Sequence, residues 1–103
     1  MKKKLKILDC NIADIHILIE ICGVEILLRY SAKEGCEVSY NTATGHKEVV
    51  DESIIKELYA EMDNIFAALS QKLGGEIYAW YSKMIIRRVY ESYGLGVAEF
   101  WHS

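Results

Sequence analysis

The chain has 103 residues, with 12 Lys and Arg against 15 Asp and Glu, which gives a net charge of −3. A domain of this size can bury one hydrophobic core without metals or disulfides, so we expect a single domain over residues 1–103. The acidic balance argues against nucleic-acid binding, because Lys and Arg contacts to phosphate supply most of that affinity. The chain has no proline, which argues against a proline-rich recognition segment.

The chain has three cysteines, Cys10, Cys22 and Cys36, which cannot all pair with one another and form no Cys-x-x-Cys motif. Reduced thiols are typical of cytoplasmic proteins, so we expect a cytoplasmic location. Acidic residues interrupt the segment after the Lys-rich start, which argues against a secretory signal. The most apolar run, residues 15–28, is too short to cross a bilayer. We therefore expect no membrane association, no metal and no cofactor.

The clearest pattern is a strict alternation of residues on both sides of Cys22 and Gly23. A period of two with many β-branched residues predicts half-buried strands, and a two-residue turn at Cys22-Gly23 joins them into a hairpin over residues 14–31. One face of this hairpin is then continuously apolar, with Ile15, Ile17, Ile19, Ile21, Val24, Ile26, Leu28 and Tyr30.

The same register defines three pairs on the other face of the hairpin: His16 with Arg29, Leu18 with Leu27, and Glu20 with Glu25. The pair of glutamates is unfavourable, because like charges directly opposite each other destabilise a sheet. Three explanations are open at this point: a longer turn, solvated carboxylates, or a cation that joins the pair. We retain the two-residue turn.

Shorter alternating segments flank the hairpin. They predict a strand at about residues 4–9, a strand at 36–40 after a turn at 33–35, and a short return strand at 46–50. The first half of the chain is therefore expected to form an antiparallel β-meander of four or five strands with one apolar face.

From residue 51 the apolar residues recur at steps of three and four, which predicts an amphipathic helix to about residue 73. Asp51 is expected to cap its N-terminus, and Gly74-Gly75 to end it. Residues 76–93 are rich in β-branched and aromatic residues, but a stretch this long without a breaker favours a helix over a strand.

The expected organisation is one α+β domain, with a sheet over 1–50, two C-terminal helices over 51–93 and a tail over 94–103. On the second helix Ile77, Trp80 and Met84 form an apolar patch beside the main apolar side. A helix that is apolar over so much of its circumference is buried on more than one side. In a domain this small, we expect another subunit to cover the patch.

Six residues are candidates for binding a partner or a ligand: Trp80, Tyr81, Arg87, Arg88, Tyr90 and Trp101. Arg88 falls among apolar and aromatic residues on a helical wheel, where a guanidinium group forms an ion pair, stacks on a ring or binds an anion. Arg87 falls on the polar side, which predicts a surface ion pair. Trp101 lies in the tail and is expected to pack on the chain's own sheet or to insert into a partner.

No catalytic motif and no Gly-rich phosphate loop are evident, which favours a non-enzymatic protein. We expect an interaction protein that forms homo-oligomers and binds another macromolecule. In size and composition the chain is similar to small phage-encoded inhibitors and accessory proteins, although no family motif matches. The alternative is a protein that binds or sequesters a small anionic ligand, such as a nucleotide, in a pocket at a subunit interface.

Overall fold

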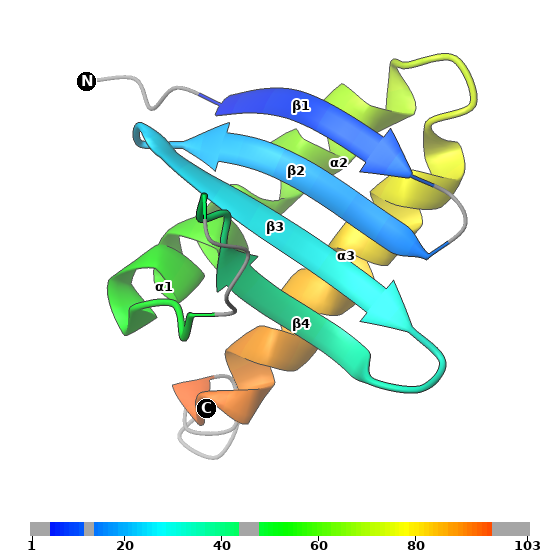
Figure 1. Ribbon diagram of the computed structural model, residues 1–103. Coiled ribbons are helices and arrows are strands. Elements are labelled where there is room, and N and C mark those ends of the chain that lie inside the picture. Colours follow the sequence, from blue (N-terminus) through cyan, green and yellow to red (C-terminus); the bar gives the residue numbers. More distant parts are fainter. Residues whose placement is uncertain (1–4, 12–13, 44–47, 96–103) are drawn as a thin grey trace, which may run out of the picture.

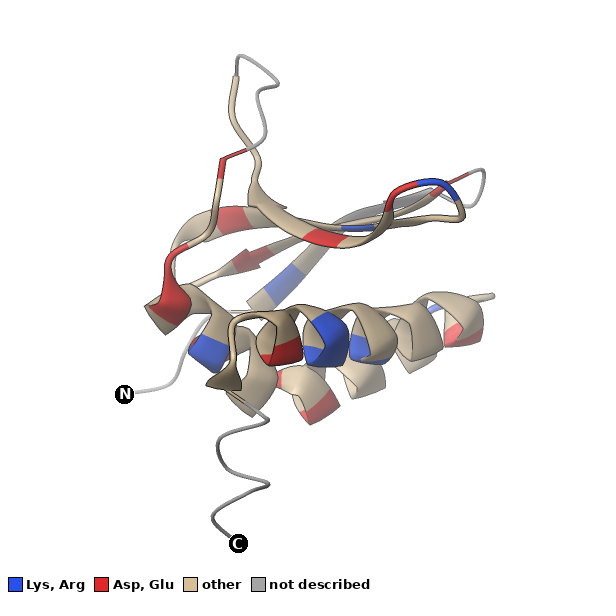
Figure 2. Ribbon diagram, turned by 90° about the horizontal axis from the view of Figure 1, so that it is seen from below, with Lys and Arg blue, Asp and Glu red and all other residues tan. Residues whose placement is uncertain are grey.

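The computed structural model describes residues 5–11, 14–43 and 48–95. These residues form four strands and then three helices: β1 (Leu5–Asn11), β2 (Ile15–Ile21), β3 (Val24–Ser31), β4 (Gly35–Tyr40), α1 (Glu52–Ala60), α2 (Met62–Ser70) and α3 (Glu76–Ser92). The strands pair in the order β1-β2-β3-β4, and all neighbours are antiparallel. The helices cover one face of this sheet, so the molecule has two layers (Figures 1 and 2). The predicted α+β class, with a meander before the helices, is confirmed.

The β2–β3 hairpin has the register predicted from the sequence, from Ile21 paired with Val24 to Ile15 paired with Tyr30. Six side chains on its helix-facing side are buried: Ile15, Ile17, Ile19, Ile21, Ile26 and Leu28. Moving each such side chain from water into the core contributes roughly 1.5–3 kcal/mol. Tyr30, at the end of the row, is half-buried against the ring of Tyr81 on α3, with 5.3 Å between the ring centroids. The hairpin therefore forms the sheet side of the hydrophobic core.

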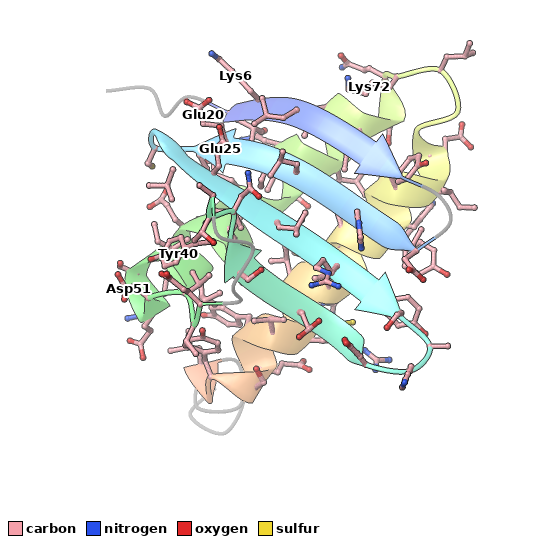
Figure 3. The ribbon with its side chains drawn as sticks, in the orientation of Figure 1. Lys6, Glu20, Glu25, Tyr40, Asp51 and Lys72 are labelled. Atoms are coloured by element: carbon pink, nitrogen blue, oxygen red, sulfur yellow. The ribbon has the colours of Figure 1, made fainter. Side chains whose placement is uncertain are left out.

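The opposed glutamates at the turn end of the hairpin have local compensation. Glu20 and Glu25 lie opposite each other, as predicted. Asn41 donates a hydrogen bond from Nδ2 to Oε1 of Glu25 at 2.8 Å and another from its backbone N–H to the Glu25 carbonyl at 3.0 Å. On the other side of Glu20, Lys6 of β1 is in register and adds a positive charge to this row of the sheet (Figure 3). The two-residue turn is therefore compatible with the charge pattern.

The edges of the sheet differ from the prediction. The return strand predicted at 46–50 is not a strand over residues 48–50, where an isolated bridge joins Val49 to Ser39. Residues 46 and 47 lie outside the described residues. β1 extends to Asn11, with a bulge that shifts the register between Ile7 and Asp9. Because a bulge interrupts the alternation of side chains, the period of two alone ended the predicted strand too early.

The prediction of two helices after the sheet is wrong, because the helix expected over 52–73 is two helices. The chain leaves helical geometry at Glu61, where φ is −94° and ψ is 5°, and α2 takes a new direction (Figure 1). The Oε1 atom of Glu61 accepts a hydrogen bond from Nδ2 of Asn64 at 3.1 Å. The apolar steps of three and four continue through Glu61, and Glu61 is not a helix breaker. The break was therefore not visible in the periodicity.

Packing against α3 explains why the chain turns at this point. The ring of Tyr59 on α1 stacks on Tyr90, near the C-terminus of α3, with centroids 3.8 Å apart. The ring of Phe66 on α2 meets Trp80, in the N-terminal half of α3, edge to face. The two short helices thus follow α3 in the opposite direction, each with its own contact.

The helix predicted over 76–93 is confirmed as α3, which ends at Ser92. Before it, α2 ends at Ser70 and a turn follows, so the predicted helix end near residue 73 is wrong by a turn of helix. Gly75 is buried in this turn, and a Cβ atom there would overlap the carbonyl oxygen of Leu69. Only glycine therefore fits at position 75.

The C-terminal end of α3 is tied to the segment before α1. The hydroxyl of Tyr93 donates a hydrogen bond to the carbonyl oxygen of Val50 at 2.6 Å. Beside it, the Tyr40 hydroxyl donates to Oδ2 of Asp51 and accepts from the Asp51 N–H (Figure 3). Asp51 occupies the N-cap position of α1, as predicted, but its side chain makes no cap hydrogen bond within the helix. Burial, together with Tyr40 and Asp51, raises the pKa of Tyr93 above its ordinary value.

The hairpin turn makes a prediction about Cys22, whose φ is 55°. A left-handed conformation costs most residues about 1–2 kcal/mol, whereas Asn-Gly is the preferred sequence for this kind of turn. We expect Cys22→Asn to raise the free energy of unfolding by about 1 kcal/mol in urea denaturation. Cys22→Val, which adds a β-branched side chain at the same position, should lower it. An Asn variant no more stable than the wild type would contradict this account of the turn.

The Tyr93 contact makes a second prediction. Tyr93→Phe removes one hydrogen bond and should lower the free energy of unfolding by about 1 kcal/mol. Because the pKa of Tyr93 is raised in the folded state, its contribution is complete below the ordinary tyrosine pKa of 10.0 and is lost as the pH rises through the raised value. Urea denaturation at neutral and alkaline pH should therefore show the difference between wild type and Tyr93→Phe shrinking at high pH. Tyr78→Phe is the control, and an equal loss in both variants would contradict the role of the Tyr93 hydroxyl.

Candidate interaction surface on the third helix

Helix α3 has one side in the core and the opposite side exposed. The core side carries the buried residues Ala79, Ser82, Ile85, Ile86, Val89 and Tyr90. On the exposed side, Trp80 is 64% exposed and Ile77 is 49% exposed. Leu73, in the turn before the helix, is fully exposed. We call this side the outer face of α3 and define it by Leu73, Ile77, Trp80, Met84, Arg87, Arg88 and Glu91.

Trp80 has a defined position although it is largely exposed. The Phe66 ring of α2 meets the indole edge to face, with the centroids 5.0 Å apart and the planes at 84°. Nζ of Lys83 lies 5.3 Å from the centroid of the same Phe66 ring and 3.8 Å from Oδ1 of Asp63. One side of the indole is thus held by α2 and the other side is free. An aromatic side chain held in this way loses little conformational freedom on binding.

The surface is hollowed on both sides of Trp80. One hollow, of about 330 Å³, is lined by Trp80, Lys83, Met84, Arg87, Arg88 and Glu91. The other includes Lys72, Leu73, Glu76, Ile77 and Trp80 in its lining. Trp80 is therefore a ridge between two open depressions, a shape that suits contact with a complementary surface.

The two arginines at the first hollow are exposed. Neither Arg87 nor Arg88 forms an ion pair with a residue in the part of the chain that the structure describes. The surface ion pair predicted for Arg87 is thus not found there. Two cations beside an exposed indole are available to a partner.

The structure brings together three of the six residues selected from the sequence: Trp80, Arg87 and Arg88 line one hollow. Tyr90 does not belong to it, because this residue is 6% exposed and its ring stacks on α1. Tyr81 is half-buried against β3, so it also supports the fold. Trp101 lies outside the described residues.

Leu73 was missed as a surface residue. Its position in the apolar pattern placed it in the last turn of the predicted helix, with its side chain toward the core. Because α2 ends at Ser70, Leu73 belongs to a turn and its side chain faces outward. The Gly74-Gly75 pair that follows is the only signal of this ending, and it does not show that the helix stops before Leu73.

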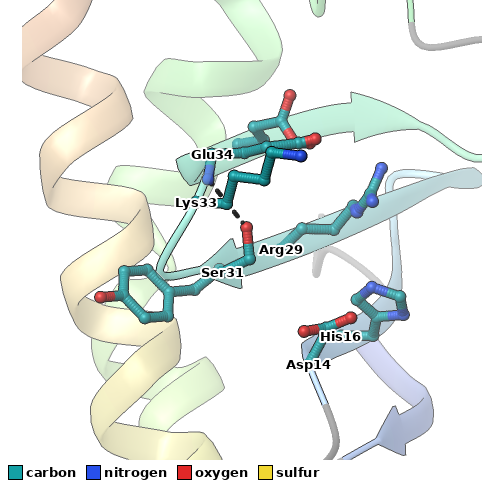
Figure 4. A pocket seen from close by; sticks show the side chains of 8 residues that line it. Asp14, His16, Arg29, Ser31, Lys33 and Glu34 are labelled. Atoms are coloured by element: carbon teal, nitrogen blue, oxygen red, sulfur yellow. Dashed lines mark hydrogen bonds between the residues drawn. The ribbon is translucent and has the colours of Figure 1, made fainter.

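A polar hollow of about 240 Å³ lies around the β3–β4 turn and the start of β2 (Figure 4). Its lining includes two cationic side chains, Arg29 and Lys33, and the imidazole of His16. It also includes three carboxylates, those of Asp14, Glu34 and Glu37. Arg29 lies in register between His16 and Glu37, and the N–H of Glu34 donates to Oγ of Ser31 at 3.0 Å. Since Arg29 and Lys33 face three carboxylates, this hollow has no surplus of positive charge that would favour an anion.

Cysteine chemistry has little support from the geometry. Burial raises the pKa of the Cys36 thiol, and the charge of Arg88 opposes this shift without cancelling it. Since the thiolate is the reactive form, a thiol with a raised pKa is a poor nucleophile at neutral pH. Cys36 is therefore better explained as a half-buried packing residue.

Among the side chains that the structure describes, no three from His, Cys, Asp or Glu gather as a metal site would require. Within residues 5–11, 14–43 and 48–95, no helix combines the length and the apolar character needed to cross a membrane. Comparisons with protein-family models, with curated proteins and with solved structures found no match. The function must therefore be argued from the geometry of the outer face of α3.

Proposed function

We propose that this protein works by association and not by catalysis, forming homo-oligomers and binding another macromolecule through the outer face of α3. The observation that carries the proposal is the exposure of Trp80 between Ile77 and the hollow at Arg87. Tryptophan and arginine are the residues most enriched at the centres of protein interfaces. An indole held in place by Phe66 and left open on its other side has the properties of such a centre.

The composition of the surface around Trp80 supports a macromolecular partner. Ile77 and Leu73 extend the apolar area along one direction, and Arg87 and Arg88 lie in the other. Apolar contact supplies affinity, while charges at the rim select the partner and its orientation. By covering part of a partner's surface, such a protein can inhibit it, which is the role suggested by the similarity in size and composition to small phage inhibitors.

A second candidate is the binding of a small anionic ligand, such as a nucleotide, with the hollow completed at a subunit interface. It rests on Arg87 and Arg88 beside an indole, which form no ion pair with the described residues, since guanidinium groups bind phosphate and indole rings stack on bases. In one copy the hollow is open, whereas small-molecule sites bury most of their ligand. A macromolecular partner therefore has the stronger support.

The proposal predicts that Trp80→Ala weakens self-association at least tenfold, because an interface centre contributes about 2 kcal/mol or more. The dissociation constant would be measured by sedimentation equilibrium over a series of protein concentrations, with thermal denaturation as a check of folding. Val49→Ser is the matched control, because Val49 is an exposed apolar residue outside α3. If Trp80→Ala and Val49→Ser both associate like the wild type, and both keep the same co-purifying partners, the outer face of α3 is not the working surface.

The second candidate predicts that a nucleotide raises the melting temperature of the protein. A ligand that binds only the folded state stabilises it by mass action, so the shift should grow with nucleotide concentration. Arg88→Ala should abolish the shift and Lys33→Ala should preserve it. The absence of a shift with every nucleotide tested would remove this candidate and leave the macromolecular proposal intact.

A further inference from the structure

The order of charges along the outer face of α3 indicates what covers it. Lys72 lies in the turn before the helix (Figure 3), and Glu76 lies in the first turn. Arg87 and Glu91 follow in the C-terminal half of α3, and all four residues are exposed. Within α3, the acid Glu76 thus lies toward the N-terminus and the bases Arg87 and Arg88 lie toward the C-terminus, with Trp80 between them and Glu91 after them.

These charged residues share a narrow side of the helix. At about 100° per residue, Glu76, Arg87 and Glu91 fall within an arc of about 60°. Trp80 and Met84 lie in or next to this arc. Lys72 precedes the helix but lines the same hollow as Glu76 and Trp80. A second helix laid along this side would meet Glu76, Trp80, Met84, Arg87 and Glu91.

Glu76 and Arg87 carry opposite charges and lie about three helical turns apart on this side, and their midpoint lies between residues 81 and 82. A two-fold axis through this point would place Glu76 opposite Arg87 of a second copy. In a two-fold interface every such contact occurs twice.

The same two-fold axis would also bring apolar side chains together at the centre of the interface. Trp80 would lie opposite Lys83 and Met84 of the second copy, so the free side of the indole would meet a thioether and a methylene chain. Methionine fills irregular gaps and makes favourable contacts with aromatic rings. An unrelated acidic partner would satisfy Arg87 but would repel Glu76 and Glu91.

We propose that the occupant of the outer face of α3 is a second copy of this chain, with the two α3 helices antiparallel about an axis between residues 81 and 82. This inference rests on the proposed function and specifies its first partner. The apolar contacts around Trp80 provide the affinity, since exposed ion pairs each contribute little. The opposite charges of Glu76 and Arg87 select the antiparallel direction and the register.

Charge reversal tests the register. Arg87→Glu would oppose Glu76 twice in the dimer, and Glu76→Arg would oppose Arg87 twice. Each single variant should raise the dimer dissociation constant about tenfold at low salt, and the double variant Glu76→Arg with Arg87→Glu should return to within about threefold of the wild type. Sedimentation equilibrium measures all three.

Two controls guard against trivial explanations. Lys33→Glu makes the same change in net charge as Arg87→Glu on an exposed turn of the sheet, and it should associate like the wild type. Reversal in the first turn of a helix also perturbs the helix dipole. Circular dichroism of each variant is therefore the second control, because it shows whether the helices are intact.

The outcomes separate this inference from the proposed function. If each single change weakens the dimer and the double variant restores it, the antiparallel pair is supported. A wild-type dimer that is indifferent to these reversals overturns the register, while the Trp80→Ala result still decides whether the outer face of α3 is used. A wild type that stays monomeric up to high micromolar concentration overturns the second copy as occupant, and the proposed function then rests on other macromolecules.

Discussion

The structure depends on the need to cover one apolar face of the β2–β3 hairpin. Branched side chains from Ile15 to Leu28 line that face, and in the fold they are removed from water. A sheet with such a face is stable only when another layer packs on it. The three helices form this layer, and the contact of Tyr93 with Val50 closes it at one end. The placement of the helices on one face of the sheet meets this requirement.

The same requirement gives α3 two unlike sides. Its inner side completes the core with residues such as Ile85 and Ile86, whereas α1 and α2 occupy only its flank. No element in the described ranges lies over its outer face, so Trp80 and Ile77 stay exposed. An apolar ridge edged by charges of both signs is costly to leave in water and well suited to recognition. The proposals of association and of an antiparallel pair both derive from this geometry.

Part of the candidate site could be predicted from the sequence and part could not, and the difference has a physical reason. A helical wheel separated Trp80 from the main apolar side of α3 because the angle between positions is a local property. It could not tell that Tyr90 meets α1, because that contact requires the chain to turn at Glu61. Leu73 was misplaced for the same reason, since the end of α2 depends on the close approach of Gly75 to Leu69.

The sequence by itself determined the class of fold, the register of the central hairpin and the existence of α3. These features depend on local properties of the chain: an alternation with a period of two, a two-residue turn and a long stretch without a helix breaker. Contacts between distant residues therefore do not alter them. Only the tertiary structure decided that six turns of amphipathic pattern divide at Glu61, that Asn41 and Lys6 accommodate the opposed glutamates, and which side of α3 is left open. These features depend on contacts between residues distant in the chain, which no local period encodes.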